Sequence, residues 1–87
     1  AFSYARQRHQ GSAQRGAPPA PIIAHPDVRR MLTDMRARTM AIRMIAYAAA
    51  VAIDQAHSAQ DPAARHAASE RASLLTPIVK AFCSDTA

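Results

Sequence analysis

The sequence predicts an all-α fold, in which a long antiparallel helical hairpin follows a short N-terminal helix. The chain has only two glycines among 87 residues, and both occur before position 17. Beyond them, apolar residues recur at spacings of three and four, the period of an amphipathic helix. Two short Pro/Asp motifs, His25-Pro26-Asp27 and Asp61-Pro62, are typical of helix starts, because proline fits the first helical turn and aspartate complements its dipole.

The first element is expected to be the end of a helix covering residues 1–10. Gly11 follows it, and glycine commonly ends a helix in the left-handed conformation. Residues 11–25 contain both glycines and three prolines, so they are predicted to form an extended linker.

Two long helices are expected next, at about 26–58 and 62–87, and the short connection between them predicts an antiparallel hairpin. At 1.5 Å per residue, the first would be on the order of 50 Å long. Pro77 lies inside the second and is expected to kink it. Core packing is expected for the methionines of the first long helix. The apolar face of that helix comprises Val28, Met31, Leu32, Met35, Ile42, Ile45, Ala46, Ala49, Ile53 and Ala56.

The composition indicates one partial domain that needs partners. Hydrophobic residues make up 49% of the chain, but alanine dominates them and buries little area. A helical segment begins close to residue 1, and no cap closes the last helix before Ala87. We therefore expect an excerpt of a larger helical protein that self-associates in isolation.

The net charge of +5 is concentrated in the first half. Residues 1–43 carry eight Arg against two Asp, a net of +6, whereas residues 44–87 carry three basic against four acidic groups, a net of −1. Such a basic segment suits an anionic cofactor, an acidic partner or nucleic acid. A single lysine and few aromatic residues disfavour nucleic acid.

Other function classes find little support. The longest stretch without an acidic, basic or histidine residue, Met44–Ile53, is about half of what a membrane span needs. The four histidines lack the spacing of metal ligands, and Cys83 is the only cysteine. No paired carboxylates, Ser-His-Asp set or glycine-rich phosphate loop is present, so no catalytic residue is assigned.

Three segments carry a resemblance to a known family. Tyr4–Gly11 reads Tyr-Ala-Arg-Gln-Arg-His-Gln-Gly, His25–Leu32 reads His-Pro-Asp-Val-Arg-Arg-Met-Leu, and Leu75–Asp85 reads Leu-Thr-Pro-Ile-Val-Lys-Ala-Phe-Cys-Ser-Asp. In this order the segments resemble successive helices in the C-terminal domain of flavin-dependent acyl-CoA dehydrogenases, most closely the long bacterial members. That domain is a four-helix bundle that covers the flavin.

The resemblance implies that Arg8 and Gln10 contact the phosphates of FAD, typically across a subunit interface. The aromatic residue that usually precedes the glycine is absent, so its stacking on the adenine is not carried over. The family's catalytic base is a glutamate beyond this segment, and Glu70 does not match it. The excerpt alone is therefore expected to be inactive.

For the parent protein the resemblance implies a cytoplasmic homo-oligomer that dehydrogenates an acyl-CoA substrate and passes electrons to an acceptor. Two other hypotheses remain from the residues themselves. One is a non-catalytic helical interaction module that assembles through its Met, Ala and Ile face. The other is a basic nucleic-acid binder, which strongly salt-dependent DNA binding would reveal.

Overall fold

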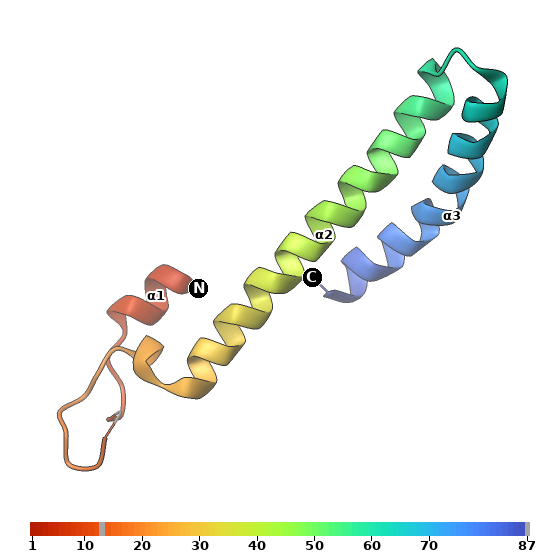
Figure 1. Cartoon of the computed structure of the whole chain (residues 1–87). Helices are drawn as coiled ribbons and strands as arrows, with labels where there is room; N and C mark the ends of the chain where they lie inside the picture. Colours follow the sequence, from red (N-terminus) through yellow and green to blue (C-terminus); the bar gives the residue numbers. More distant parts are fainter. Residues whose placement is uncertain (13, 87) are drawn as a thin grey trace. The chain divides into compact units, whose positions relative to one another are not determined.

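The structure is a computed structural model that describes residues 1–12 and 14–86. These residues contain the helix α1 (Phe2–Gln7), the short 3-10 turn η1 (Ile22–Ala24), and the helices α2 (Pro26–Ser58) and α3 (Pro62–Thr86) (Figure 1). The all-α fold class is confirmed. The chain divides into two compact units, Ala1–Ala37 and Arg38–Ala87, with the boundary inside α2.

In the first unit, α1 packs against η1. Ala5 of α1 is only 2% exposed, and Ile22 and Ile23 of η1 are half-buried. The helix α1 ends at Gln7, three residues earlier than Gln10, the expected end. Arg8 has extended backbone angles, φ −75° and ψ 122°, and its carbonyl oxygen accepts a hydrogen bond from the Ile22 amide at 2.8 Å. Pairing with a distant segment therefore replaces the next helical turn.

The start of α2 follows the Pro/Asp motif. Pro26 is the first helical residue, and Asp27 lies in the first turn. His25 precedes them, and its carbonyl oxygen accepts the Arg29 amide at 3.1 Å. Because that bond spans one helical turn, His25 occupies the N-cap position of α2.

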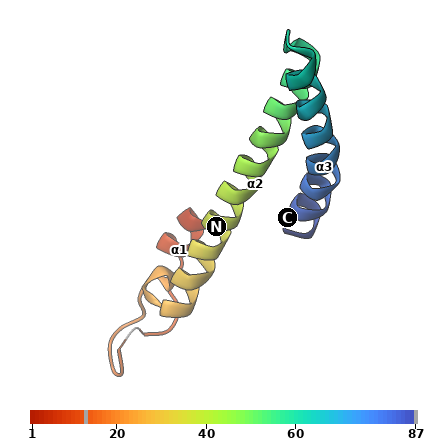
Figure 2. The same cartoon turned by 45° about the vertical axis from the view of Figure 1, so that its right-hand side comes forward.

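The second unit is the expected hairpin. Beyond Ser58 the chain turns within three residues, and α3 starts at Pro62. The Asp61 carboxylate accepts the Ala63 amide at 3.3 Å, a bond that caps the new helix. The two helices run antiparallel in both views (Figures 1 and 2).

Small residues form the buried part of this hairpin. Ala49 and Ala52 of α2 and Ala68 of α3 are 7%, 2% and 7% exposed. Alanine adds little bulk, so it suits a buried position between two helices. The helix α3 continues through Pro77 to Thr86, and its ribbon changes direction in its second half, as an interior proline favours (Figures 1 and 2).

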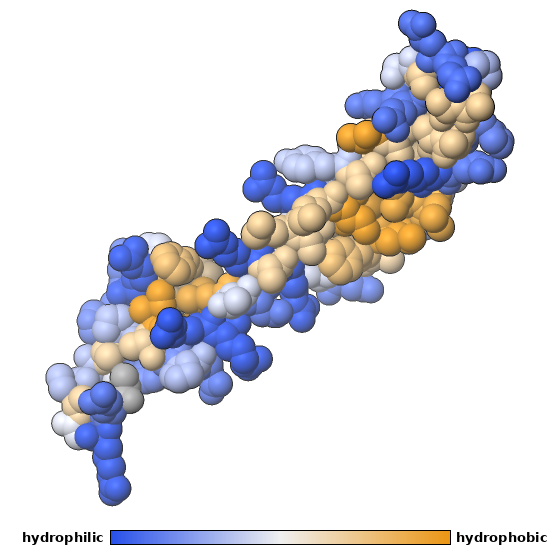
Figure 3. Space-filling model, in the orientation of Figure 1, coloured by the Kyte–Doolittle hydropathy of each residue, from blue (hydrophilic) through white to orange (hydrophobic). Residues whose placement is uncertain are grey.

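Much apolar surface stays outside these contacts. The expectation that the methionines pack in a core is wrong within this chain, because all four are exposed, from Met35 at 47% to Met44 at 69%. In the hairpin unit, Figure 3 shows apolar surface in orange and tan among the charged groups. The other large exposed apolar side chains of that unit are Tyr47, Val51, Ile53, Leu74, Ile78 and Phe82. None of the helices in the described part of the chain is long and apolar enough to cross a membrane.

Candidate functional site

Residues 8–12 and 14–25 belong to a loop that follows α1 and closes on itself. The Gln10 amide donates to the Ala20 carbonyl at 3.1 Å, and the Ala20 amide donates to the Gly11 carbonyl at 3.0 Å. With the bond from Ile22 to Arg8, these contacts form a short antiparallel pairing centred on an isolated bridge between His9 and Pro21. The predicted linker is thus folded back on itself, and all three of its prolines follow Gly16.

Two glycines give the loop its turns. Gly16 has φ +81° at the tip, within a turn that is closed by a bond from the Ala17 amide to the Gln14 carbonyl at 3.1 Å. Gly11 has φ +66° at the base, a left-handed conformation in which a residue other than glycine would be strained. The sequence predicts that Gly11 ends the first helix, but α1 already ends at Gln7. Gly11 instead turns the chain into the loop.

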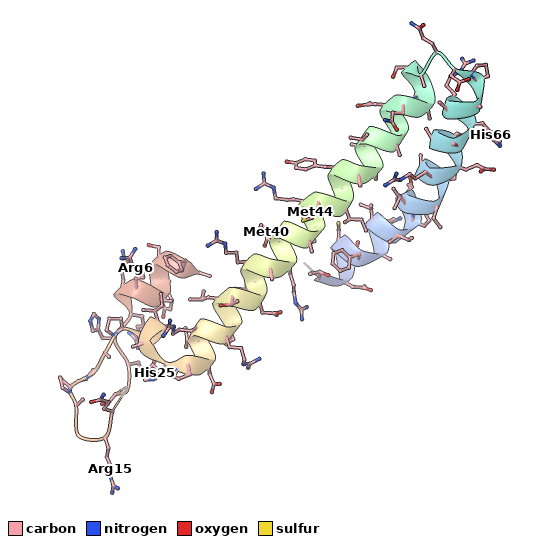
Figure 4. All side chains as sticks on the ribbon, in the orientation of Figure 1. Arg6, Arg15, His25, Met40, Met44 and His66 are labelled. Carbon is pink, nitrogen blue, oxygen red and sulfur yellow. The ribbon has the colours of Figure 1, made fainter. Side chains whose placement is uncertain are left out.

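The His25 imidazole closes the base of the loop from the other side. Its Nε2 lies 2.8 Å from the Gln10 carbonyl oxygen, a side-chain bond across fifteen residues. Because the carbonyl can only accept, Nε2 must carry the hydrogen. A Cβ placed on Gly11 would lie 3.4 Å from the same ring, so the loop backbone passes directly against it. Figure 4 shows His25 at the base of the loop, with Arg15 pointing away from its tip.

The backbone of Arg8 is held at both polar atoms. Its amide donates to the Tyr4 carbonyl at 2.8 Å, and its carbonyl accepts from Ile22. The side chain is exposed, and no partner for its guanidinium is found among the described residues. The structure thus fixes where the Arg8 side chain starts and leaves its five N–H donors available.

Gln10 is held in the same way. Its amide is bonded to Ala20 and its carbonyl to His25, while its exposed side-chain amide is directed by neither bond. The two residues predicted to contact a cofactor therefore lie two positions apart on one segment whose backbone is held by hydrogen bonds.

The electrostatic surroundings of this segment are positive. Arg6, Arg8 and Arg15 precede the first acidic residue, Asp27. The Arg6 guanidinium lies 5.7 Å from the centre of the Phe2 ring, a cation–π contact that holds it beside α1. The Arg8 guanidinium, which has no acidic partner among the described residues and extends from a held backbone, suits a phosphate group. It can bind a phosphate with paired, charge-assisted hydrogen bonds. The donor set therefore fits a dinucleotide pyrophosphate.

The second unit offers less chemistry. His66 and Glu70 form an exposed pair at 3.3 Å along one helix face, and Cys83 is half-buried. Within the described residues, His, Cys, Asp and Glu do not gather in groups of three that suit a metal ion. A groove of about 300 Å³ lies between α2 and α3, lined by Tyr47, Ala48, Val51, Ala52, Gln55 and Arg71.

The residue that sequence reasoning missed is His25. The sequence places His25 at a helix start and gives it no metal-ligand spacing, and neither observation indicates a contact with Gln10. One signal was available in the sequence: N-cap positions favour Ser, Thr, Asp and Asn, and histidine is not among the preferred residues.

Comparison with known proteins gives a consistent result. The family model described as "Acyl-CoA dehydrogenase, C-terminal domain" matches residues 1–87. The chain is 46% identical over its whole length to 3-methylmercaptopropionyl-CoA dehydrogenase of Ruegeria pomeroyi, and covers 15% of that protein. It is 34% identical to butyryl-CoA dehydrogenase of Syntrophomonas wolfei, again over its whole length and 15% of the relative. No solved structure matches the chain. The resemblance noted in the sequence is confirmed: this chain belongs to the acyl-CoA dehydrogenase family, as part of its C-terminal helical domain.

Proposed function

We propose that the chain works as part of a longer, FAD-dependent acyl-CoA dehydrogenase that introduces an α,β double bond into an acyl-CoA thioester. Support comes from the family match over the whole chain and from two relatives that are both named as acyl-CoA dehydrogenases. Because the chain spans only 15% of those relatives, most of such an enzyme would lie outside these residues. When bound, the flavin supplies the acceptor for the hydride that leaves the β-carbon.

We assign Arg8 and Gln10 to the binding of the FAD phosphates. The observation that carries this assignment is the pinned backbone of residues 8–11, which presents an exposed guanidinium in a segment without acidic residues. Arg8 would hold the pyrophosphate, and the Gln10 amide would donate a further hydrogen bond.

We propose that the catalytic base lies outside these 87 residues. Glu70, the only glutamate, is exposed and paired with His66, an arrangement typical of a solvated helix face. The chain by itself is therefore proposed to be inactive. For the whole protein we propose an acyl-CoA substrate, a separate electron acceptor, homo-oligomeric assembly and a cytoplasmic location.

The test is flavin retention by the full-length protein carrying Arg8→Ala. The loss of a charge-assisted hydrogen bond, worth about 1.5–3 kcal/mol, predicts roughly 10- to 150-fold weaker FAD binding. The matched control is Arg15→Ala, which removes the same charge from the loop tip, where the side chain points away (Figure 4). Equal flavin content in both variants would count against the Arg8 assignment.

A second candidate is a non-catalytic helical interaction module. The exposed apolar side chains of α2 and α3 favour it, since Met44, Leu74 and Met31 are 69%, 64% and 51% exposed. A full-length protein that assembles through these helices but retains no flavin after reconstitution would support this candidate over the enzyme.

A further inference from the structure

We infer that His25 is a positioning residue for the cofactor-contacting segment, acting through its hydrogen bond to the Gln10 carbonyl. The inference rests on the proposed function, because it assigns His25 a part in the binding carried out by Arg8 and Gln10. His25 itself touches only the loop backbone, and its effect on the ligand is indirect.

The first argument is the unusual use of an N-cap side chain. At this position a side chain normally accepts a hydrogen bond from the second or third amide of its own helix. The His25 imidazole instead donates to Gln10, while its carbonyl alone serves α2 through Arg29. The residue thus gives up the capping contact for a contact across the loop.

The second argument is the number of elements that meet at His25. Its amide donates to the Ile22 carbonyl at 3.0 Å, its carbonyl accepts from Arg29, and its ring reaches Gln10. One residue therefore joins η1, the first turn of α2 and the loop base. Movement of Gln10 relative to α2 requires the ring bond to break.

The third argument is the arrangement of bonds around the cofactor-contacting segment. The Gln10 carbonyl is bound only by His25 among the described residues, whereas the Arg8 carbonyl is bound by the Ile22 amide. The peptide that follows Gln10 leads into Gly11, which has a left-handed backbone and where an added Cβ would lie 3.4 Å from the His25 ring. Without the imidazole, the Gln10 carbonyl loses this bond, and within the described part of the chain only the two bonds to Ala20 hold the backbone of Gln10 and Gly11.

Two variants separate positioning from helix capping. His25→Asn introduces a preferred N-cap residue, so the start of α2 is kept. The asparagine side chain is too short to place a donor where Nε2 lies, so the bond to the Gln10 carbonyl is lost. His25→Gln places its amide nitrogen at about the reach of Nε2 and so restores a donor. Both are made in the full-length protein, alongside Arg8→Ala.

Two measurements are made on each variant. Hydrogen exchange of the apoprotein, followed by mass spectrometry over residues 9–21, reports the closed loop without any cofactor. Titration of the apoprotein with FAD, followed by flavin fluorescence, reports binding. We expect His25→Asn to speed exchange and weaken FAD binding about fivefold, the effect of one net hydrogen bond, and His25→Gln to stay within about twofold of the parent.

The outcomes are distinguishable. If His25→Asn leaves hydrogen exchange over residues 9–21 unchanged, the bond from His25 to Gln10 does not hold the loop and the inference is wrong. If exchange rises and Arg8→Ala weakens FAD binding, but His25→Asn binds FAD normally, the inference is wrong while the proposed function stands. If neither His25→Asn nor Arg8→Ala changes FAD binding, both the inference and the Arg8 assignment are overturned.

Discussion

The buried alanines of the hairpin give a prediction whose magnitude follows from the structure. Ala52 of α2 is 2% exposed and lines the groove beside Arg71 of α3, whereas Ala50, two residues earlier on the same helix, is exposed. Replacing either by glycine costs about 0.8–1.0 kcal/mol in helix propensity. Only Ala52→Gly also loses a buried methyl group, worth about 0.8 kcal/mol more.

We therefore expect Ala52→Gly to lower the free energy of unfolding by about 2 kcal/mol and Ala50→Gly by about 1 kcal/mol. Urea denaturation of the 87-residue chain, followed by far-ultraviolet circular dichroism at matched concentration, measures both values. The difference between the variants isolates the contact with α3, because propensity is common to both. Equal destabilisation would refute the close packing of α2 against α3 at Ala52.

Two further predictions concern the loop and the exposed faces. Gly11→Ala is expected to cost about 1–2 kcal/mol from its left-handed backbone and to weaken FAD binding by the full-length protein. Gly16 has φ +81° and nothing within 4 Å of an added Cβ, so Gly16→Ala carries similar backbone strain at the tip. The Gly16→Ala variant is expected to bind FAD normally. Equal losses of FAD affinity in the two variants would contradict the role of the loop base. The isolated 87-residue chain is expected to self-associate through its exposed Met, Leu and Phe side chains, and sedimentation analysis showing a monomer at all concentrations would contradict this.

The helices could be predicted from the sequence because their signals are local. Pro26 and Pro62 mark the first residues of α2 and α3, and the Asp61 cap bond is visible in the structure. The end of α1 at Gln7 could not be predicted in the same way. It depends on the pairing of Arg8 with Ile22, fourteen residues away, and neither composition nor periodicity reports such a contact.

The methionines show a second limit. Helical spacing identifies which residues share a face, but it does not identify what covers that face. Within the second unit, Met44 shares the long helix with the buried Ala49 and Ala52, yet Met44 is 69% exposed. The site shows a third limit: family resemblance points to Arg8 and Gln10, whereas the bond between His25 and Gln10 joins residues fifteen positions apart, and no local sequence pattern indicates it.

The most direct test of the central claim is an experimental structure of the full-length protein with FAD bound. We expect the Arg8 guanidinium to lie about 2.7–2.9 Å from a phosphate oxygen of the cofactor, with the bond between His25 and Gln10 intact. A structure in which the pyrophosphate is held elsewhere and Arg8 faces solvent would contradict the account.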